Sequence, residues 1–132
     1  MKKSTRSMQS PITRARGLGS ARHGTSHWWM QRLTALALIP LTLYFLNGFF
    51  TYVVFGSYDG AIYWLRSPYA ATFVILLLIA GFHHGASGLQ VVIEDYVHCE
   101  CAKLASILII KFLAAAFAIL GILATAKILF GV

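Results

Sequence analysis

The chain has 132 residues and a net charge of +7, and 58% of its residues are hydrophobic while only 11% are charged, against about a quarter charged in soluble proteins. This composition excludes a water-soluble globule and a disordered chain, and two cysteines are too few for a secreted disulfide scaffold. At this length we expect one membrane domain, so any large-scale chemistry would be shared with partner subunits.

The net charge is concentrated before the first apolar run. Basic residues but no acidic ones occur up to position 32: Lys2, Lys3, Arg6, Arg14, Arg16, Arg22 and Arg32. A basic block directly before a membrane span marks the cytoplasmic side, and we prefer this interpretation to nucleic-acid binding. Residues 1–27 are therefore predicted to form a basic cytoplasmic arm. An organelle transit peptide has a similar composition and remains an alternative.

Three continuous apolar stretches follow, at about residues 28–55, 69–93 and 104–130. Each exceeds the roughly 20 residues that a helix needs to cross a hydrocarbon core, and none alternates like a barrel strand. We predict an all-α membrane domain of three transmembrane helices over residues 28–132, with the N-terminus cytoplasmic and the C-terminus extracytoplasmic. Turn residues connect the first two spans, and Pro40 would kink its helix or be tolerated.

The second span carries two adjacent histidines, His83 and His84. Ionisable groups deep in a membrane suggest a function, and the candidates are haem ligation, another metal, a proton relay or a bond between helices. Adjacent side chains on a helix point about 100° apart, so both cannot ligate one iron. No other histidine lies within a span, so a second haem ligand would come from another polypeptide.

Glycines accompany these histidines. Gly81, Gly85 and Gly88 recur at spacings of four and three and remove side-chain bulk from one part of the helix surface. Either a flat macrocycle or a second helix could approach closely there, and the glycines alone do not distinguish the two.

Polar residues mark the ends of the spans. Arg32 begins the first span, where its guanidinium could pair with a haem propionate or extend to the membrane surface. Asp95 and Tyr96 end the second span, where a phenol beside a carboxylate could donate a hydrogen bond and exchange protons with a lipophilic quinone, or simply sit at the interface. The run His98-Cys99-Glu100-Cys101 is too closely spaced for a structural zinc site.

The segment His84-Gly85-Ala86-Ser87-Gly88-Leu89-Gln90-Val91-Val92-Ile93-Glu94-Asp95-Tyr96-Val97-His98 places a histidine eleven residues before an Asp-Tyr pair. This segment resembles the hydrophobic membrane-anchor subunits of succinate dehydrogenase, respiratory complex II. The segments 16–21 and 27–35 look like the alphaproteobacterial branch of that family. The resemblance covers about residues 14–132.

The resemblance implies roles for individual residues. His84 would be an axial ligand of a haem b, with the second ligand in a partner anchor protein of the cytochrome b556 type, and His83 would be left to bond across helices. Tyr96 would line the ubiquinone site beside Asp95, and Arg32 would lie near the haem propionates.

The resemblance also implies a complex. The chain would anchor flavoprotein and iron–sulfur subunits to the lipid bilayer of a bacterial inner membrane rather than a mitochondrial one, in the tricarboxylic acid cycle and respiratory electron transfer. A quinol:fumarate reductase anchor and a haem-free structural anchor are the alternatives. A small multidrug-type transporter would usually carry a carboxylate within a span, and none of the three predicted spans contains one.

Overall fold

The computed structural model describes residues 24–131, which are helical throughout apart from short connections and contain no strand. The elements are α2 (Gly24–Gly48), η1 (Phe49–Val54), α3 (Tyr58–Leu65), α4 (Pro68–Tyr96) and α5 (Glu100–Phe130). Three segments in the described part are long and apolar enough to cross a membrane: Trp28–Val54, Pro68–Tyr96 and Glu100–Phe130. The predicted all-α fold with three spans is confirmed. The predicted arm, residues 1–27, lies almost wholly outside the described residues, so its boundary stays a prediction.

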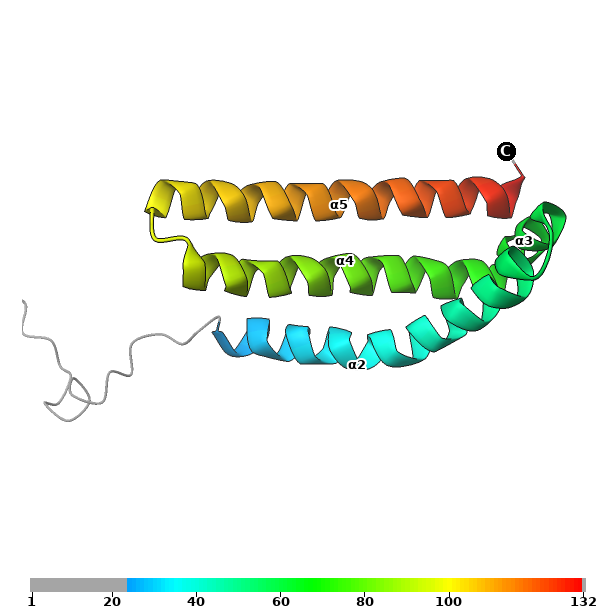
Figure 1. Cartoon of the computed structure of the whole chain (residues 1–132), viewed down its shortest axis with the longest axis horizontal. Coiled ribbons are helices and arrows are strands. Elements are labelled where there is room, and N and C mark those ends of the chain that lie inside the picture. Colours follow the sequence, from blue (N-terminus) through cyan, green and yellow to red (C-terminus); the bar gives the residue numbers. More distant parts are fainter. Residues whose placement is uncertain (1–23, 132) are drawn as a thin grey trace, which may run out of the picture.

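The three long helices lie side by side in one row, with α4 in the middle (Figure 1). α4 packs against α2 on one side and α5 on the other. The first turns of α2 and the short connection between α4 and α5 lie at one end of the row, which we call the loop end. η1, α3 and the end of α5 lie at the opposite end, which we call the connector end.

The helices extend further than the apolar stretches predict. α4 continues to Tyr96 and α5 begins at Glu100, so the gap of residues 94–103 between the second and third apolar stretches contains a connection of only residues 97–99. Hydropathy marks only the part of a helix that fits in hydrocarbon, whereas the backbone stays helical in the polar layer beyond. Glu100 suits the first turn of α5 because its negative charge faces the positive end of the helix dipole.

The connection between the first two spans contains a helix, α3, where the sequence suggests only turn residues. The side chain of Ser57 accepts a hydrogen bond from the backbone N–H of Gly60 at 3.2 Å, and Asp59 lies in the first turn. Pro68 then occupies the start of α4, where its missing N–H costs nothing. Residues that favour turns act here as helix caps.

α2 continues through Pro40 without a break, so the proline is tolerated, and the helix curves over its second half (Figure 1). It then widens into the π-helical turn η1, where the N–H of Phe55 donates to the carbonyl of Phe50 at 2.9 Å. At the far end of the chain α5 stops at Gly131, whose φ of 72° suits glycine.

The most tightly packed part of the chain lies at the connector end. Trp64 is only 7% exposed and packs with Ala70 and Val74. Partly buried side chains surround this cluster: Tyr44, Phe45, Tyr52, Leu65 and Leu78. Most other large apolar side chains are exposed, and none of the most apolar window of α5 is buried. A single row of helices leaves broad apolar faces, which suit contact with lipid or with other subunits.

Candidate functional site

His84 lies at the interface between α2 and α4, where its Nδ1 is 3.2 Å from Oγ1 of Thr34. The imidazole is half-buried, and it lies 12 residues before the end of α4, about 18 Å along the helix axis at 1.5 Å per residue. His83 is exposed instead and lines a groove between α4 and α5. The two neighbouring histidines therefore lie on different surfaces of α4, as the helical geometry predicts.

The surroundings of His84 do not suit a bare metal ion, but they suit a haem iron. Among the described residues no three His, Cys, Asp or Glu side chains gather to hold a metal ion. A haem iron takes its equatorial ligands from the macrocycle and needs only axial side chains, so one histidine from this chain suffices. His84 fits that role, because Nδ1 is engaged by Thr34 and no described residue forms a hydrogen bond with Nε2.

The glycines around His84 are not required by contacts within the chain. A Cβ built on Gly85 meets nothing within 4 Å, and one on Gly88 meets Nε2 of Gln31 at 3.5 Å, an ordinary contact. A Cβ on Gly121 would instead lie 2.8 Å from Leu78, inside van der Waals distance. Gly81 and Gly85 line an apolar groove of about 250 Å³ between α4 and α5. The space beside Gly85 is therefore open to something outside this chain.

Gln31 has an unsatisfied polar atom in the same region. Its Oε1 is buried and has no hydrogen-bond partner among the described residues. A buried acceptor without a donor costs about 1–3 kcal/mol. Gln31 precedes Thr34 by almost one turn of α2 and lies beside Gly88, one turn beyond His84 on α4. This interface is thus incomplete in polar contacts, and a donor from a partner or bound group would complete it.

Asp95 and Tyr96 end α4 at the loop end, and both are exposed, Tyr96 by 78%. Neither side chain is hydrogen-bonded within the part of the chain that the structure describes. Both are therefore available to a ligand or to a neighbouring subunit at this end of the row.

Arg32 lies near the start of α2, exposed, with its Cζ 4.2 Å from the ring centroid of Trp28. Arg32 and Thr34 are two residues apart, about 200° around the helix, so Arg32 does not share the face of α2 that contacts His84. The chain alone does not bring this guanidinium to the histidine.

A second groove runs between α4 and α5, with a volume of about 370 Å³. Polar groups in an otherwise small and apolar lining face it: His83, Ser87, Gln90 and Lys111. Gln90 also donates to Oε1 of Glu94 at 2.7 Å. Lys111 therefore faces a partly polar groove. Cys99 and Cys101 are free and exposed at the loop end.

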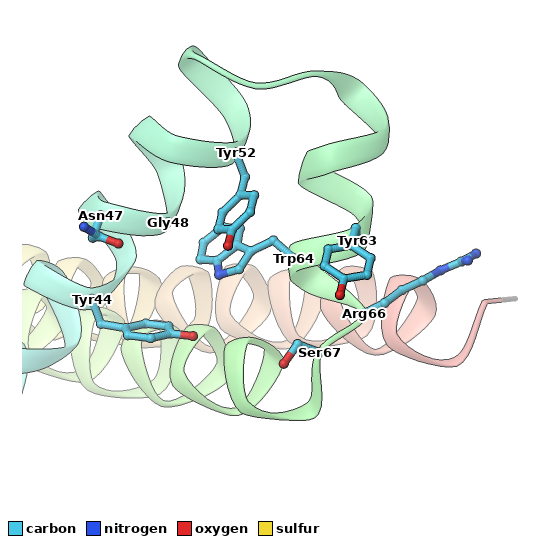
Figure 2. Close-up of a pocket in the computed structure, with 8 residues that line it drawn as sticks. All are labelled: Tyr44, Asn47, Gly48, Tyr52, Tyr63, Trp64, Arg66 and Ser67. Atoms are coloured by element: carbon cyan, nitrogen blue, oxygen red, sulfur yellow. The ribbon is translucent and has the colours of Figure 1, made fainter.

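A larger cavity, of about 570 Å³, lies at the connector end. It is lined by Tyr44, Asn47, Gly48, Tyr52, Tyr63, Trp64, Arg66 and Ser67. Figure 2 shows Tyr52 and Trp64 stacked at its centre, with Arg66 extending outward. None of the residues predicted for the site lines this cavity, so its size alone does not locate the function.

The contact between Thr34 and His84 could not be predicted from the sequence. Thr34 lies 50 residues from His84 in the chain, and a threonine in an apolar run is not by itself informative. Its position on the face of α2 that meets α4 emerges only once the helices are packed.

Comparisons with known proteins agree on one family. The model of the family described as succinate dehydrogenase/fumarate reductase transmembrane subunit matches residues 6–122. A succinate dehydrogenase hydrophobic membrane anchor subunit of Rickettsia bellii is 34% identical over 121 residues, 91% of this chain and 92% of the relative.

Two further relatives carry similar names. A succinate dehydrogenase membrane anchor subunit of Reclinomonas americana is 32% identical over 69% of this chain and 78% of its own length. The hydrophobic membrane anchor subunit of Paracoccus denitrificans is 31% identical over 78% of this chain and 79% of its own length. With three apolar spans and these relatives, the chain belongs to the succinate dehydrogenase membrane anchor subunits.

Proposed function

We propose that this anchor holds one face of a haem b and contributes to a ubiquinone site in succinate:quinone oxidoreductase. His84 would hold the haem iron from this chain, and the second ligand would come from a second anchor protein of the cytochrome b556 type. The observation that carries the proposal is the placement of His84 at mid-helix depth, with Nδ1 engaged by Thr34 and Nε2 without a hydrogen-bond partner among the described residues.

Three residues of this chain are proposed to hold the haem. His84 supplies the nitrogen ligand, and Gly85 at the next position leaves the neighbouring surface of α4 free of side-chain bulk for a flat macrocycle. Arg32 is exposed at the loop end on another face of α2 than Thr34, where its long side chain offers a cation to a propionate. A bound haem supplies reversible one-electron oxidation and reduction within the membrane.

Ubiquinone is proposed to bind at the loop end beside Tyr96. Reduction of a quinone to a quinol takes up two electrons and two protons. The Tyr96 hydroxyl donates a hydrogen bond to a quinone carbonyl, and Asp95 beside it passes protons from the aqueous side. The electrons come from the flavoprotein and iron–sulfur subunits that the anchor holds at the membrane.

The loop end is proposed to face the cytoplasm across a bacterial inner membrane, with the basic arm on the same side. The only two cysteines of the chain, Cys99 and Cys101, are exposed at this end, so labelling of their thiols shows on which side of the membrane the loop end lies. A membrane-impermeant maleimide is expected to label them in inside-out vesicles only. A Ser57→Cys variant lacking both native cysteines serves as the opposite control, and labelling from the outer side at the native cysteines would refute the orientation.

The haem assignment is tested by the reduced-minus-oxidised visible spectrum of the detergent-purified complex. We expect a b-type signal in the wild type and in His83→Ala, and a lost or weakly ligated signal in His84→Ala. His83→Ala is the matched control because it removes the neighbouring imidazole from a different surface of the same helix. A wild-type complex without a haem signal would leave the chain a structural anchor only.

A further inference from the structure

The hydroxyl of Thr34 has three neighbours and only one hydrogen. Its Oγ1 lies 2.8 Å from the carbonyl of Met30, 3.1 Å from that of Gln31 and 3.2 Å from Nδ1 of His84. Backbone carbonyls only accept hydrogen bonds, whereas an imidazole nitrogen can donate or accept, depending on the tautomer. The placement of the single hydroxyl hydrogen therefore decides the state of the histidine.

The shortest of these contacts is the one to the carbonyl of Met30, four residues earlier. Two other threonines, Thr72 and Thr125, make the same bond to the carbonyl four residues before them, each at 2.8 Å. When the hydroxyl hydrogen of Thr34 is used in this way, its lone pairs are what face the imidazole. Nδ1 must then carry the hydrogen and donate it to Oγ1.

We propose that Thr34 is a positioning residue that holds His84 in the tautomer protonated at Nδ1 and so presents the lone pair of Nε2 to a haem iron. The inference rests on the proposed haem function and adds a residue on a different helix to it. The bond to Thr34 fixes both the tautomer and the orientation of the ring, as hydrogen-bond partners of metal-binding histidines generally do. It also increases the electron density of the imidazole, which favours the ferric state of the iron.

The test uses the assembled complex with Thr34→Val, Thr34→Ala and Thr34→Ser. The valine variant keeps the branched shape without the hydroxyl, the alanine variant removes both, and the serine variant keeps the hydroxyl. Thr125→Val is the matched control, because Thr125 is a buried threonine with the same intrahelical bond and no histidine beside it.

Two quantities are measured for each complex: the rate at which haem is lost to an apo-globin acceptor, and the midpoint potential of the haem. Thr34→Val and Thr34→Ala are expected to lose haem about tenfold faster or more, as expected when the partner of a metal-binding histidine is removed. Both are expected to shift the potential to a more positive value. Thr34→Ser and Thr125→Val should stay at the wild-type values.

The outcomes separate the inference from the function on which it rests. A wild-type complex without haem, or one whose haem is unchanged in His84→Ala, would overturn the proposed function. Haem that depends on His84 but keeps its potential and loss rate in Thr34→Val and Thr34→Ala would overturn the role of Thr34 alone. A shift in the valine variant but not in the alanine variant would indicate a steric effect and would also contradict the inference.

Discussion

The two ends of this row of helices differ in how closely their side chains are packed and in whether their buried polar atoms are paired. At the connector end the chain closes on itself, because Trp64 is buried among α2, α3 and α4 and a side chain added at Gly48 would overlap its indole ring. In the half nearer the loop end, Gly85 borders open space and Gln31 has a buried oxygen without a donor among the described residues. The connector end therefore contains the best-packed cluster of the described residues, with a cavity of about 570 Å³ beside it, whereas the other half has open space and an unpaired polar atom at its centre.

The largest effect is expected at the connector end, from Trp64→Ala. Removing a large buried aromatic side chain costs about 3–5 kcal/mol of folding free energy. The yield and thermal stability of the purified complex should fall, while the haem content of each assembled complex is retained. Tyr69→Ala is the control, because this aromatic side chain lies near the same end but is 78% exposed. Equal losses of stability in both variants would contradict a closed packing unit around Trp64.

A smaller effect with the opposite pattern is expected from Gly85→Leu. The isolated surface has room for the side chain, so assembly should be near normal, but a docked macrocycle would meet it. Overpacking typically costs about 1–3 kcal/mol, which corresponds to about 5- to 150-fold weaker retention of haem. Haem loss is measured beside Ala116→Leu, which adds the same side chain at an exposed position of α5. Retention equal to that of the control would mean that nothing docks beside Gly85.

The next effect is expected from Tyr96→Phe at the loop end. It removes one hydrogen bond worth roughly 1 kcal/mol, so kcat/KM for ubiquinone should fall roughly fivefold. Succinate oxidation with a water-soluble electron acceptor should be unchanged, because the flavoprotein and iron–sulfur subunits are untouched. Equal activities with ubiquinone in the variant and the wild type would show that Tyr96 does not contribute to the ubiquinone site.

The smallest effect is expected from Glu100→Gln. It removes the ion pair with Nζ of Lys103, at 2.9 Å, but the side chain of Glu100 is 84% exposed. Such pairs contribute little in water, so the stability of the complex should change by less than about 0.5 kcal/mol in thermal unfolding. A larger loss would contradict this prediction and would show that the pair is covered in the assembled complex.

Much of the fold could be predicted from the sequence, because a membrane span needs only length and continuous hydrophobicity. The exact ends of α4 and α5 could not, since Tyr96 and Glu100 are helical in a layer where hydropathy gives no signal. α3 could not be predicted for a similar reason, because Ser57 and Asp59 suit a turn and a helix cap equally well.

The site could be predicted only in part. His84 stands out because an imidazole in an apolar run is costly, and its spacing to Asp95 and Tyr96 carries the family resemblance. Thr34 and Gln31 could not be found in this way. Their relation to His84 and Gly88 depends on how α2 packs on α4, which no local pattern specifies.

The contrast between the two halves is tested most directly by measuring low-spin b-type haem per assembled complex in His84→Ala and in Trp64→Ala. We predict that His84→Ala assembles but loses the low-spin signal, whereas Trp64→Ala assembles in lower yield and keeps the signal in each complex. A low-spin signal that survives in His84→Ala, or one that disappears from assembled Trp64→Ala, would contradict the account.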